Sequence, residues 1–317
     1  MADFSLKPGE ELDSALRRAA LYLGTAGIDS AAADAQLLAA YLLEKDAGEP
    51  VSRGRVQSLA LLGHAVPEGF ARLVTLRGER LPLQHLTGQA HFRGLTLSVG
   101  PGVFVPRPET ELLVEHALTA YRGMAGALPA LPLVVDLCTG SGAIAAALAT
   151  ELAADEQVPT PRVLAVELST DAAAWAERNL GPAGVELVAG DARTALPGYE
   201  GAVTLVASNP PYIPAGAIPK DPEVRDHDPA LALYGGGEDG MELPAAIVAR
   251  AYALLAPGGY LIMEHAETQR ELMRQALAAA GFEGIESIDD FAGKPRHTSG
   301  YKPLPGTYYQ APKNVKE

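Results

Sequence analysis

Four consecutive residues, Asn209-Pro210-Pro211-Tyr212, combine hydrogen-bond acceptors with an aromatic ring. Proline has no backbone N–H, so the stretch offers oxygen atoms with few competing donors. A planar NH2 group that is to accept a methyl group needs both N–H bonds engaged and its delocalised lone pair aimed. Asn209 can accept one N–H and a proline carbonyl the other. The same residues could equally form a rigid turn after a strand, so their context must decide.

A second candidate is the stretch Asp136-Leu137-Cys138-Thr139-Gly140-Ser141-Gly142, which lies where a predicted strand meets a predicted helix. Its two glycines allow the backbone to approach a ligand at a helix N-terminus. It differs from the G-x-G-x-x-G dinucleotide fingerprint because Ala145 occupies the third glycine position, although that fingerprint sometimes allows alanine there. By itself the stretch is also compatible with a tight turn that binds nothing.

Acidic residues follow the next two predicted strands. Glu167 can accept hydrogen bonds from both hydroxyls of a ribose, and Asp191, in Ala189-Gly190-Asp191-Ala192, could accept from an adenine amino group. Each alone is equally a solvated strand end or a turn residue. Together with Asn209 after the fourth strand, they predict a shared nucleoside pocket.

The elements that must position these residues follow a βαβ pattern from Leu131 onward, in which short apolar runs alternate with helical segments. The predicted strands are Leu133–Leu137, Val163–Val166, Val185–Val188, Val203–Ala207 and Tyr260–Met263, and the predicted helices are 142–152, 171–180, 243–255 and 267–280. This pattern predicts a doubly wound, mostly parallel α/β sheet. Such sheets bind ligands at the carboxyl ends of their strands, where the candidate residues lie.

The first eighty residues predict a small helical domain, because apolar residues recur at helical spacing and glycines separate the segments. A first helix is expected around Leu12–Leu23, a second after Asp29 or Ser30, and a third from Pro67. Alternating apolar residues over 90–105 predict a β-hairpin. The expected domains are 1–82 (helical, substrate recognition), 83–106 (hairpin linker), 107–306 (α/β domain) and 307–317 (strand end or tail).

The composition and net charge of the chain argue against several classes of function. The chain has 317 residues, a formal net charge of −14, one cysteine (Cys138) and seven scattered histidines. The acidic balance disfavours stable nucleic-acid binding, and the cysteine and histidine content predicts neither a disulfide framework nor a metal site. The N-terminal residues lack signal-peptide features and no later run reaches the ~20 apolar residues of a membrane span, so a cytoplasmic protein with no membrane association is expected.

The candidate residues closely resemble the class I methyltransferases, which use S-adenosylmethionine and include enzymes with an Asn-Pro-Pro-Tyr motif that methylate planar nitrogens. The likeness is closest to the protein-(glutamine-N5) methyltransferase family that modifies peptide chain release factors, and it extends over nearly all of residues 10–300. The segments that carry it are Pro82–Gly88, Val105–Glu111, Glu223–Pro229, Ala232–Gly236 and Asp290–Arg296.

This resemblance implies a seven-stranded methyltransferase sheet and a specific assignment of residues. Residues 138–142 would wrap the methionine part of the cofactor, Glu167 would bind its ribose and Asp191-Ala192 would lie beside adenine, with Asp136 and Asn209 also at the cofactor. Asn209 and the Pro210 carbonyl would hold the NH2 group of the glutamine in a Gly-Gly-Gln loop, flanked by Pro211 and Tyr212. S-adenosylhomocysteine would be the product, and a release factor the protein partner.

Two positions depart from the family pattern, and both concern the cofactor site. Cys138 stands where glycine is usual, and Glu167 replaces the commoner aspartate. A ribosomal-protein glutamine methyltransferase remains an alternative, and so, with less support, does a DNA amino-methyltransferase, which should carry a basic region. A non-catalytic nucleotide-binding or interaction module is the alternative from a different class. The segment Ile213–Gly240 is long for a connection, which predicts a role in substrate capture.

Overall fold

The computed structural model describes residues 3–305, which form two compact units. The helical unit comprises the residues up to Ala90, with Val99–Pro101 and Ile218–Asp228. The sheet unit comprises His91–Ser98, Gly102–Ala217 and the residues from Pro229 onward. Residues 218–228 therefore follow the sheet unit in chain order but pack with the helical unit. The domain boundaries expected from the sequence stay a prediction, and Tyr308–Glu317 lies outside the described residues.

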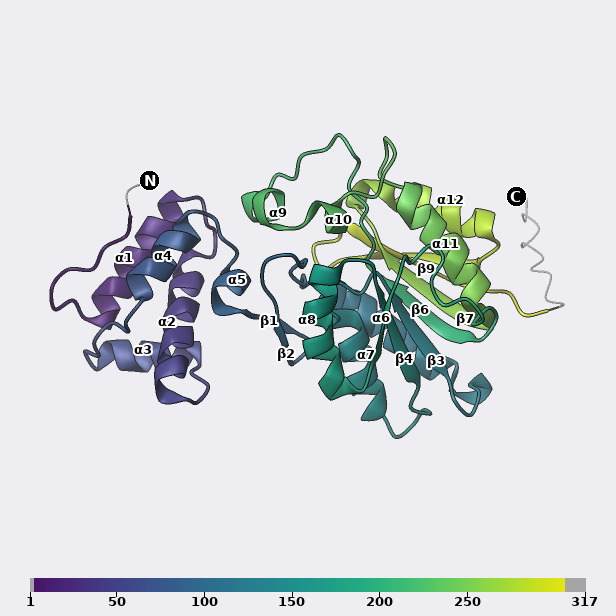
Figure 1. Ribbon diagram of the computed structural model, residues 1–317, viewed down its shortest axis with the longest axis horizontal. Helices are drawn as coiled ribbons and strands as arrows, with labels where there is room; N and C mark the ends of the chain where they lie inside the picture. Colours follow the sequence, from purple (N-terminus) through teal and green to yellow (C-terminus); the bar gives the residue numbers. More distant parts are fainter. Residues whose placement is uncertain (1–2, 306–317) are drawn as a thin grey trace, which may run out of the picture. The chain divides into compact units, whose positions relative to one another are not determined.

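The helical unit is built from helices that are coloured purple to blue in Figure 1, except for the last of them, which is green. They are α1 (Leu12–Thr25), α2 (Ala31–Ala47), α3 (Arg53–Leu61), α4 (Phe70–Gly78), α5 (Leu83–Thr87) and α9 (Pro222–His227). In α1, Leu12, Ala19 and Leu23 are buried at helical spacing, as predicted. The helix expected from Pro67 begins only at Phe70, because Gly69 adopts a left-handed φ of 85° that a helix interior does not allow.

A two-stranded hairpin follows, formed by β1 (Gln89–Phe92) and β2 (Leu95–Ser98). Arg93 and Gly94 connect the strands with φ of 46° and 76°. Two consecutive positive φ angles are the signature of the tight turn whose twist matches that of paired strands. The predicted hairpin is confirmed, but its strands are shorter than the 90–105 segment.

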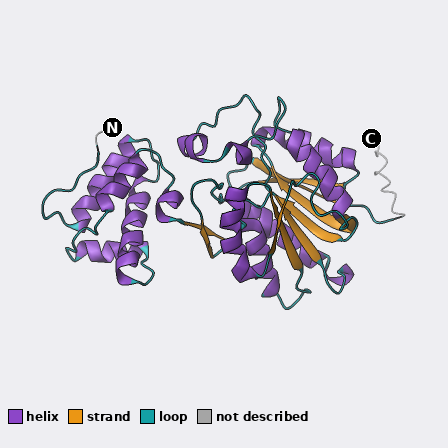
Figure 2. Ribbon diagram, in the orientation of Figure 1, coloured by secondary structure: helices purple, strands orange, loops and turns teal. Residues whose placement is uncertain are grey.

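The sheet unit contains seven strands in the order β5-β4-β3-β6-β7-β9-β8, shown in orange in Figure 2. Their bounds are β3 (Leu133–Leu137), β4 (Arg162–Glu167), β5 (Glu186–Ala189), β6 (Val203–Ser208), β7 (Leu255–Glu264), β8 (Glu283–Asp289) and β9 (Pro295–Tyr301). The five strands from β5 to β7 pair in parallel, whereas β9 is antiparallel to both of its neighbours. The predicted doubly wound, mostly parallel seven-stranded sheet is confirmed.

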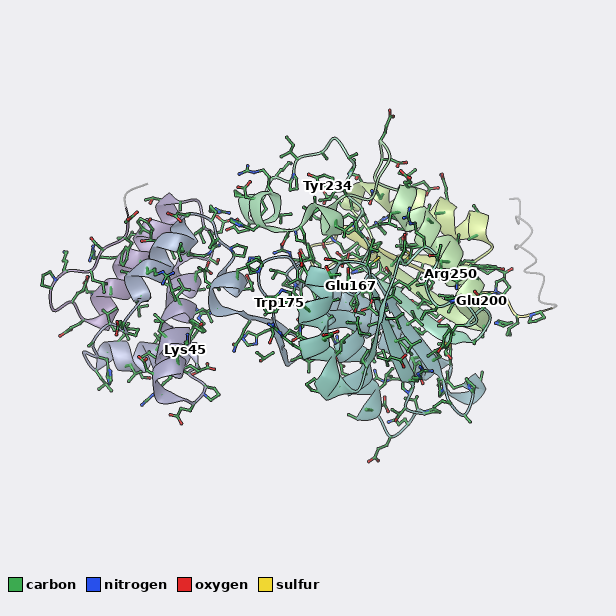
Figure 3. The ribbon with its side chains drawn as sticks, viewed as in Figure 1. Lys45, Glu167, Trp175, Glu200, Tyr234 and Arg250 are labelled. Atoms are coloured by element: carbon green, nitrogen blue, oxygen red, sulfur yellow. The ribbon has the colours of Figure 1, made fainter. Side chains whose placement is uncertain are left out.

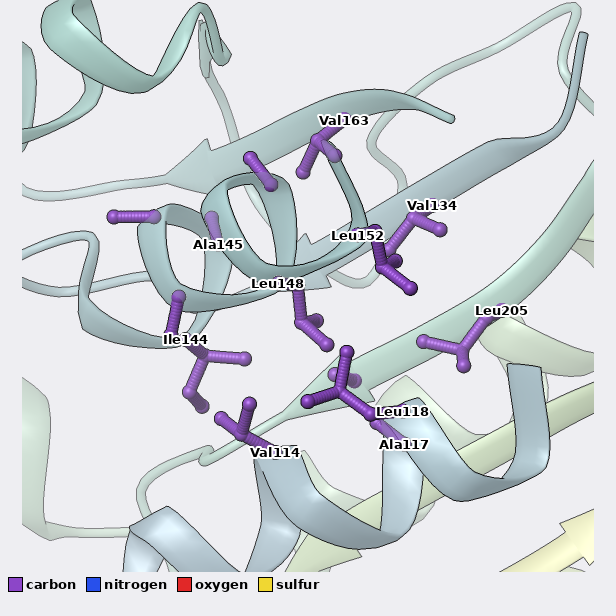
Figure 4. Close-up of a cluster of buried hydrophobic side chains, with 14 of the residues drawn as sticks. Val114, Ala117, Leu118, Val134, Ile144, Ala145, Leu148, Leu152, Val163 and Leu205 are labelled. Carbon is purple, nitrogen blue, oxygen red and sulfur yellow. The ribbon is translucent and has the colours of Figure 1, made fainter. Parts of the chain in front are cut away.

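Helices cover both faces of this sheet, because successive side chains of a strand point to opposite sides. Val134 packs under α6 (Thr110–Gly123), α7 (Ala143–Ala153) and α8 (Thr170–Leu180), whereas Val135 packs under α11 (Glu242–Leu254) and α12 (Arg270–Ala280). Figure 4 shows the first of these layers between α6, α7 and the strands. The unit also contains the short helix α10 (Ala230–Leu233) and 3-10 turns at Ala125–Ala127, Gly181–Ala183 and Glu267–Gln269.

The strand order places the candidate residues together. From the neighbouring strands β3 and β6 the chain proceeds outward in opposite directions, to β4 and β5 on one side and to β7 on the other. The carboxyl ends of all five strands meet at one edge of the sheet, and this switch point is where open α/β sheets bind ligands. Among the helices of residues 3–305, none is long and apolar enough to cross a membrane.

Candidate active site

The loop after β3 is held from beneath by Asp136, whose side chain is fully buried. Its Oδ2 accepts hydrogen bonds from the Thr139 hydroxyl at 2.5 Å and the Ala145 N–H at 3.2 Å. Burial, and secondarily the charge of Glu167, raises the pKa of Asp136 to about 7. Its other oxygen, Oδ1, has no hydrogen-bond partner within residues 3–305.

The backbone of this loop turns sharply at three residues with positive φ: Cys138 at 63°, Gly140 at 57° and Gly142 at 86°. The turn therefore requires the left-handed conformation at position 138, and Cys138 adopts it at a cost of about 1–3 kcal/mol relative to an unstrained backbone. The departure from glycine is thus tolerated without altering the turn. Nothing lies within 4 Å of a Cβ placed on Gly140, so this part of the loop is open to a ligand.

Glu167, labelled in Figure 3, ends β4 and turns its carboxylate onto the neighbouring backbone. Oε2 accepts from the Gly140 N–H at 2.8 Å, and Oε1 accepts from the Leu168 and Ser169 N–H groups at 3.0 and 2.8 Å. A carboxylate can accept about four hydrogen bonds, so capacity remains on Oε2 for a ligand hydroxyl. Burial raises the pKa of Glu167, while the three N–H donors oppose that shift.

Asp191, after β5, is paired with Arg193. The guanidinium lies 2.6 Å from Asp191 Oδ2, and Oδ1 also accepts from the Arg193 N–H at 2.9 Å. These contacts lower the pKa of the Asp191 carboxyl. The neighbouring Ala192 is buried. A hydrogen bond from adenine to the Asp191 carboxylate would therefore compete with the hydrogen bonds from Arg193. The assignment of Asp191 to adenine stays a prediction.

The loop and its acids fit a nucleoside cofactor. Gly140 leaves room for close approach, Glu167 keeps an acceptor directed at the loop, and the Asp136 Oδ1 atom is buried without a partner. Thr139 and Ser141 are almost fully buried, so contacts from these two residues would be made mainly through the backbone. Within residues 3–305, no group of three or more His, Cys, Asp or Glu side chains could hold a metal ion.

The Asn-Pro-Pro-Tyr stretch leaves β6 at the switch point, and the backbone around it is tightly packed. The Tyr212 and Ile213 N–H groups donate to the Leu233 carbonyl at 3.2 and 2.8 Å. A Cβ placed on Gly235 would lie 2.7 Å from the Pro211 carbonyl oxygen, and one on Gly240 would lie 2.2 Å from that of Tyr212. These glycines are required because no side chain fits between the two segments.

Asn209 and Tyr212 converge on a buried carboxylate. Asn209 Nδ2 lies 3.4 Å from Thr110 Oγ1, the Thr110 hydroxyl donates to Glu264 Oε2 at 2.7 Å, and the Tyr212 hydroxyl donates to Glu264 Oε1 at 3.1 Å. Burial and the charge of Glu264 raise the pKa of Tyr212. No described residue donates to Asn209 Oδ1 or to the Pro210 carbonyl. Neither predicted acceptor is therefore engaged by a donor of the described residues, although Pro210 as a whole is buried.

The sequence analysis did not identify two residues of this cluster, Thr110 and Glu264, as site residues. Glu264 directly follows the apolar run of the fifth parallel strand, so the strand-end argument that singled out Glu167 also applied to it. Thr110 begins α6, far from the motif in sequence, and its position beside Asn209 depends on how α6 packs on β6 and β7.

Three further charged or titratable side chains make local contacts. Arg225 pairs with Asp226 at 2.6 Å on the surface. Arg107 lies 5.0 Å from the centre of the Phe104 ring. His265 is fully buried and its Nε2 lies 2.8 Å from the Thr298 hydroxyl, so packing accounts for it.

The strand order, with one antiparallel strand inserted next to the end of a parallel sheet, is the α/β fold expected of a class I methyltransferase. The family described as the PrmC N-terminal domain matches residues 14–88. Proteins named release factor glutamine methyltransferase match nearly the whole chain. The one from Streptomyces coelicolor is 45% identical over 89% of this chain and 95% of its own length, and that from Mycolicibacterium smegmatis is 44% identical over 90% and 95%.

The chain therefore belongs to the release factor glutamine methyltransferase family. A further relative differs in the acceptor that its name gives. It is the 4-amino-L-phenylalanine/4-methylamino-L-phenylalanine methyltransferase of Streptomyces pristinaespiralis, 41% identical over 85% of this chain and 88% of its own length.

Proposed function

We propose that this enzyme transfers a methyl group from S-adenosylmethionine to the side-chain amide nitrogen of the glutamine in the Gly-Gly-Gln loop of peptide chain release factors. Family membership supports the reaction. The observation that carries the proposal is the pair of oxygen acceptors at the switch point, Asn209 Oδ1 and the Pro210 carbonyl, to which no described residue donates. Two acceptors suit a group that has two N–H donors.

In this proposal the loop of residues 138–142 holds the methionine part of the cofactor, Glu167 accepts from its ribose, and Asp191 and Ala192 flank its adenine. Asp136 is fully buried and holds the loop in shape by accepting hydrogen bonds from Thr139 and Ala145. Asn209 and the Pro210 carbonyl engage the two N–H bonds of the glutamine. Pro211 and Tyr212 flank its amide plane.

The chemistry demands positioning more than a strong base. S-adenosylmethionine supplies a methyl group bonded to a positively charged sulfur, and breaking that S–C bond leaves S-adenosylhomocysteine as the leaving group. The glutamine nitrogen forms the new N–C bond, and the methylated nitrogen then releases a proton to solvent. The acceptors aim the nitrogen lone pair and stabilise the positive charge that develops on the NH2 group.

The helical unit, in this proposal, recognises the protein substrate, and the reaction takes place in the cytoplasm. The acidic chain, with a net charge of −14, favours a protein acceptor over a nucleic acid.

A radiolabel experiment tests the acceptor. The enzyme is incubated with methyl-labelled S-adenosylmethionine and, separately, with a release factor, the same factor with its Gly-Gly-Gln glutamine replaced by alanine, ribosomal protein, DNA and 4-amino-L-phenylalanine. We expect label on the first factor and none on its variant. Label on any other acceptor, with none on the release factor, would overturn the proposal.

The two glycines of the cofactor loop should respond differently to alanine. At Gly142 a Cβ would lie 2.9 Å from Leu180 Cδ2, so Gly142→Ala should lower the free energy of unfolding by about 2–4 kcal/mol through overpacking and backbone strain. At Gly140 the Cβ meets nothing within 4 Å and φ is 57°, so Gly140→Ala should cost about 1–2 kcal/mol, through backbone strain alone.

The methyl group that Gly140→Ala adds would instead occupy the space through which we propose that the cofactor approaches. Gly140→Ala should therefore weaken S-adenosylmethionine binding at least about tenfold, a loss of roughly 1.4 kcal/mol. Urea denaturation and calorimetric titration measure the two effects. Unchanged cofactor affinity in Gly140→Ala would remove this loop from the proposed cofactor site.

A further inference from the structure

The carboxylate of Glu264 lies behind the acceptor motif and is 2% exposed. The Thr110 and Tyr212 hydroxyls donate to its two oxygens, and His297 Nε2 lies 3.6 Å from Oε2. Burial alone would raise the pKa of Glu264, but His297, the Thr110 hydrogen bond and the Arg296 charge hold that pKa below its usual range. Both hydroxyls donate to this carboxylate, and an ionised carboxylate can only accept hydrogen bonds.

Counting donors determines the direction of the chain of hydrogen bonds. The Thr110 hydroxyl has a single hydrogen, which it donates to Glu264 at 2.7 Å. Toward Asn209, Thr110 Oγ1 can then only accept. The Asn209 group facing it at 3.4 Å must be the NH2 end of the amide, not the oxygen. Since the two ends of an amide point in different directions, Asn209 Oδ1 is directed away from Thr110.

We propose that Thr110 and Glu264 are positioning residues that orient the Asn209 amide so that its oxygen faces the methyl acceptor. The proposal rests on the proposed function and deepens it, because it names the residues that direct Asn209 Oδ1 toward the NH2 group. The same carboxylate holds the Tyr212 hydroxyl, so Glu264 orients both motif side chains. A reversed Asn209 amide would present N–H groups to an NH2 group and repel it.

A purely structural role for these residues predicts a different outcome. Glu264 ends β7, Thr110 begins α6 and His297 lies on β9, so their contacts also connect three elements of the sheet unit. Loss of such a connection would lower stability and would affect cofactor binding and catalysis together. Loss of amide orientation would lower turnover while leaving the binding of both substrates nearly intact.

Isosteric variants separate the two roles. Thr110→Val removes the hydroxyl at constant shape, Thr110→Ser retains it, and Glu264→Gln replaces an acceptor-only group with one that also donates. Thr204→Val is the matched control, because Thr204 is a buried threonine at the opposite end of β6 from Asn209. For each variant, kcat and KM for the release factor, the affinity for S-adenosylmethionine and the thermal midpoint are measured.

We expect kcat to fall by about 10- to 100-fold in Thr110→Val and Glu264→Gln, as for other losses of reactant orientation, with KM and cofactor affinity changed less than about threefold. Thr110→Ser should restore kcat to within about threefold of wild type, and Thr204→Val should match wild type. Near-normal kcat in Thr110→Val, or equal losses in Thr110→Val and Thr110→Ser, would overturn the inference. Failure of the wild-type enzyme to methylate a release factor would instead overturn the proposed function.

Discussion

Asn209→Ala is expected to lower the rate of release-factor methylation by at least about 100-fold, the usual effect of removing one preorganised hydrogen-bonding group from a transition state. The variant loses Asn209 Oδ1, to which no described residue donates. It also leaves one N–H of the glutamine amide without an acceptor, so that the planar amide group is held less firmly in its reactive orientation. Single-turnover kinetics with saturating cofactor measure the loss. Affinity for S-adenosylmethionine should change much less, because the proposed cofactor loop follows a different strand.

Asn179→Ala is the matched comparison, since it removes the same side chain from a supporting position. Asn179 Nδ2 donates to the Ser98 and Ser141 carbonyls at 2.9 and 2.8 Å, and so fixes the loop that precedes α7. We expect weaker cofactor binding and lower stability, but substantial turnover once the cofactor is saturating. If Asn209→Ala retained near-normal turnover, Asn209 would not be the acceptor that aims the substrate nitrogen.

Glu223→Ala is expected to lower the free energy of unfolding of the helical unit by about 3–5 kcal/mol, the typical cost of removing one partner from a buried ion pair. Glu223 Oε1 lies 2.6 Å from Arg77 Nη1, and Oε2 lies 2.5 Å from Arg80 Nη2. Arg77 also binds Asp34 at 2.7 Å. The side chains of Asp34, Arg77 and Glu223 are all less than 10% exposed, so water cannot replace the lost partner.

Hydrogen exchange measures this effect, because it reports separately on the helices of the helical unit and on α9. The substitution should accelerate exchange in residues 218–228 first, since Glu223 binds that segment to α4 and the residues after it. Arg225→Ala, in the same helix, is the control. Its partner Asp226 is about half exposed, and an exposed pair contributes about 0–1 kcal/mol. Equal exchange rates in the two variants would contradict the assignment.

The Glu223 carboxyl group should also make the stability of the native state depend on pH. Burial tends to raise the pKa of Glu223, but hydrogen bonding to Asp221 and to the Arg80 and Arg77 guanidinium groups outweighs burial and brings the pKa down to about 2. A carboxyl group with a pKa lowered by folding stabilises the native state above its unfolded pKa of about 4.3. We expect that stabilisation to be lost as pH falls from about 4.5 toward 2, and the loss should be smaller in Glu223→Gln.

Much of the sheet unit could be predicted because its signals are local. Short apolar runs separated by helical segments predicted the five parallel strands, and the residues directly after them marked the ligand edge of the sheet. The N-terminal helices were less predictable. In α3, only Val56, Leu59 and Ala60 are buried, so the segment carries a weak apolar pattern. α5 is a single short turn of five residues with none buried.

By itself, the sequence determined which candidate binding residues follow each strand. A glycine-bearing turn follows the first strand, an acidic residue follows each of the next two, and Asn209 with two prolines follows the fourth. Only the tertiary structure decided what lies behind them. Thr110 and Asn209 are 99 residues apart, and Glu264 is 154 residues from Thr110. No sequence period links residues at such distances. Helix packing on the sheet brings them within hydrogen-bonding reach, and the single hydrogen of one hydroxyl then sets the direction of the Asn209 amide.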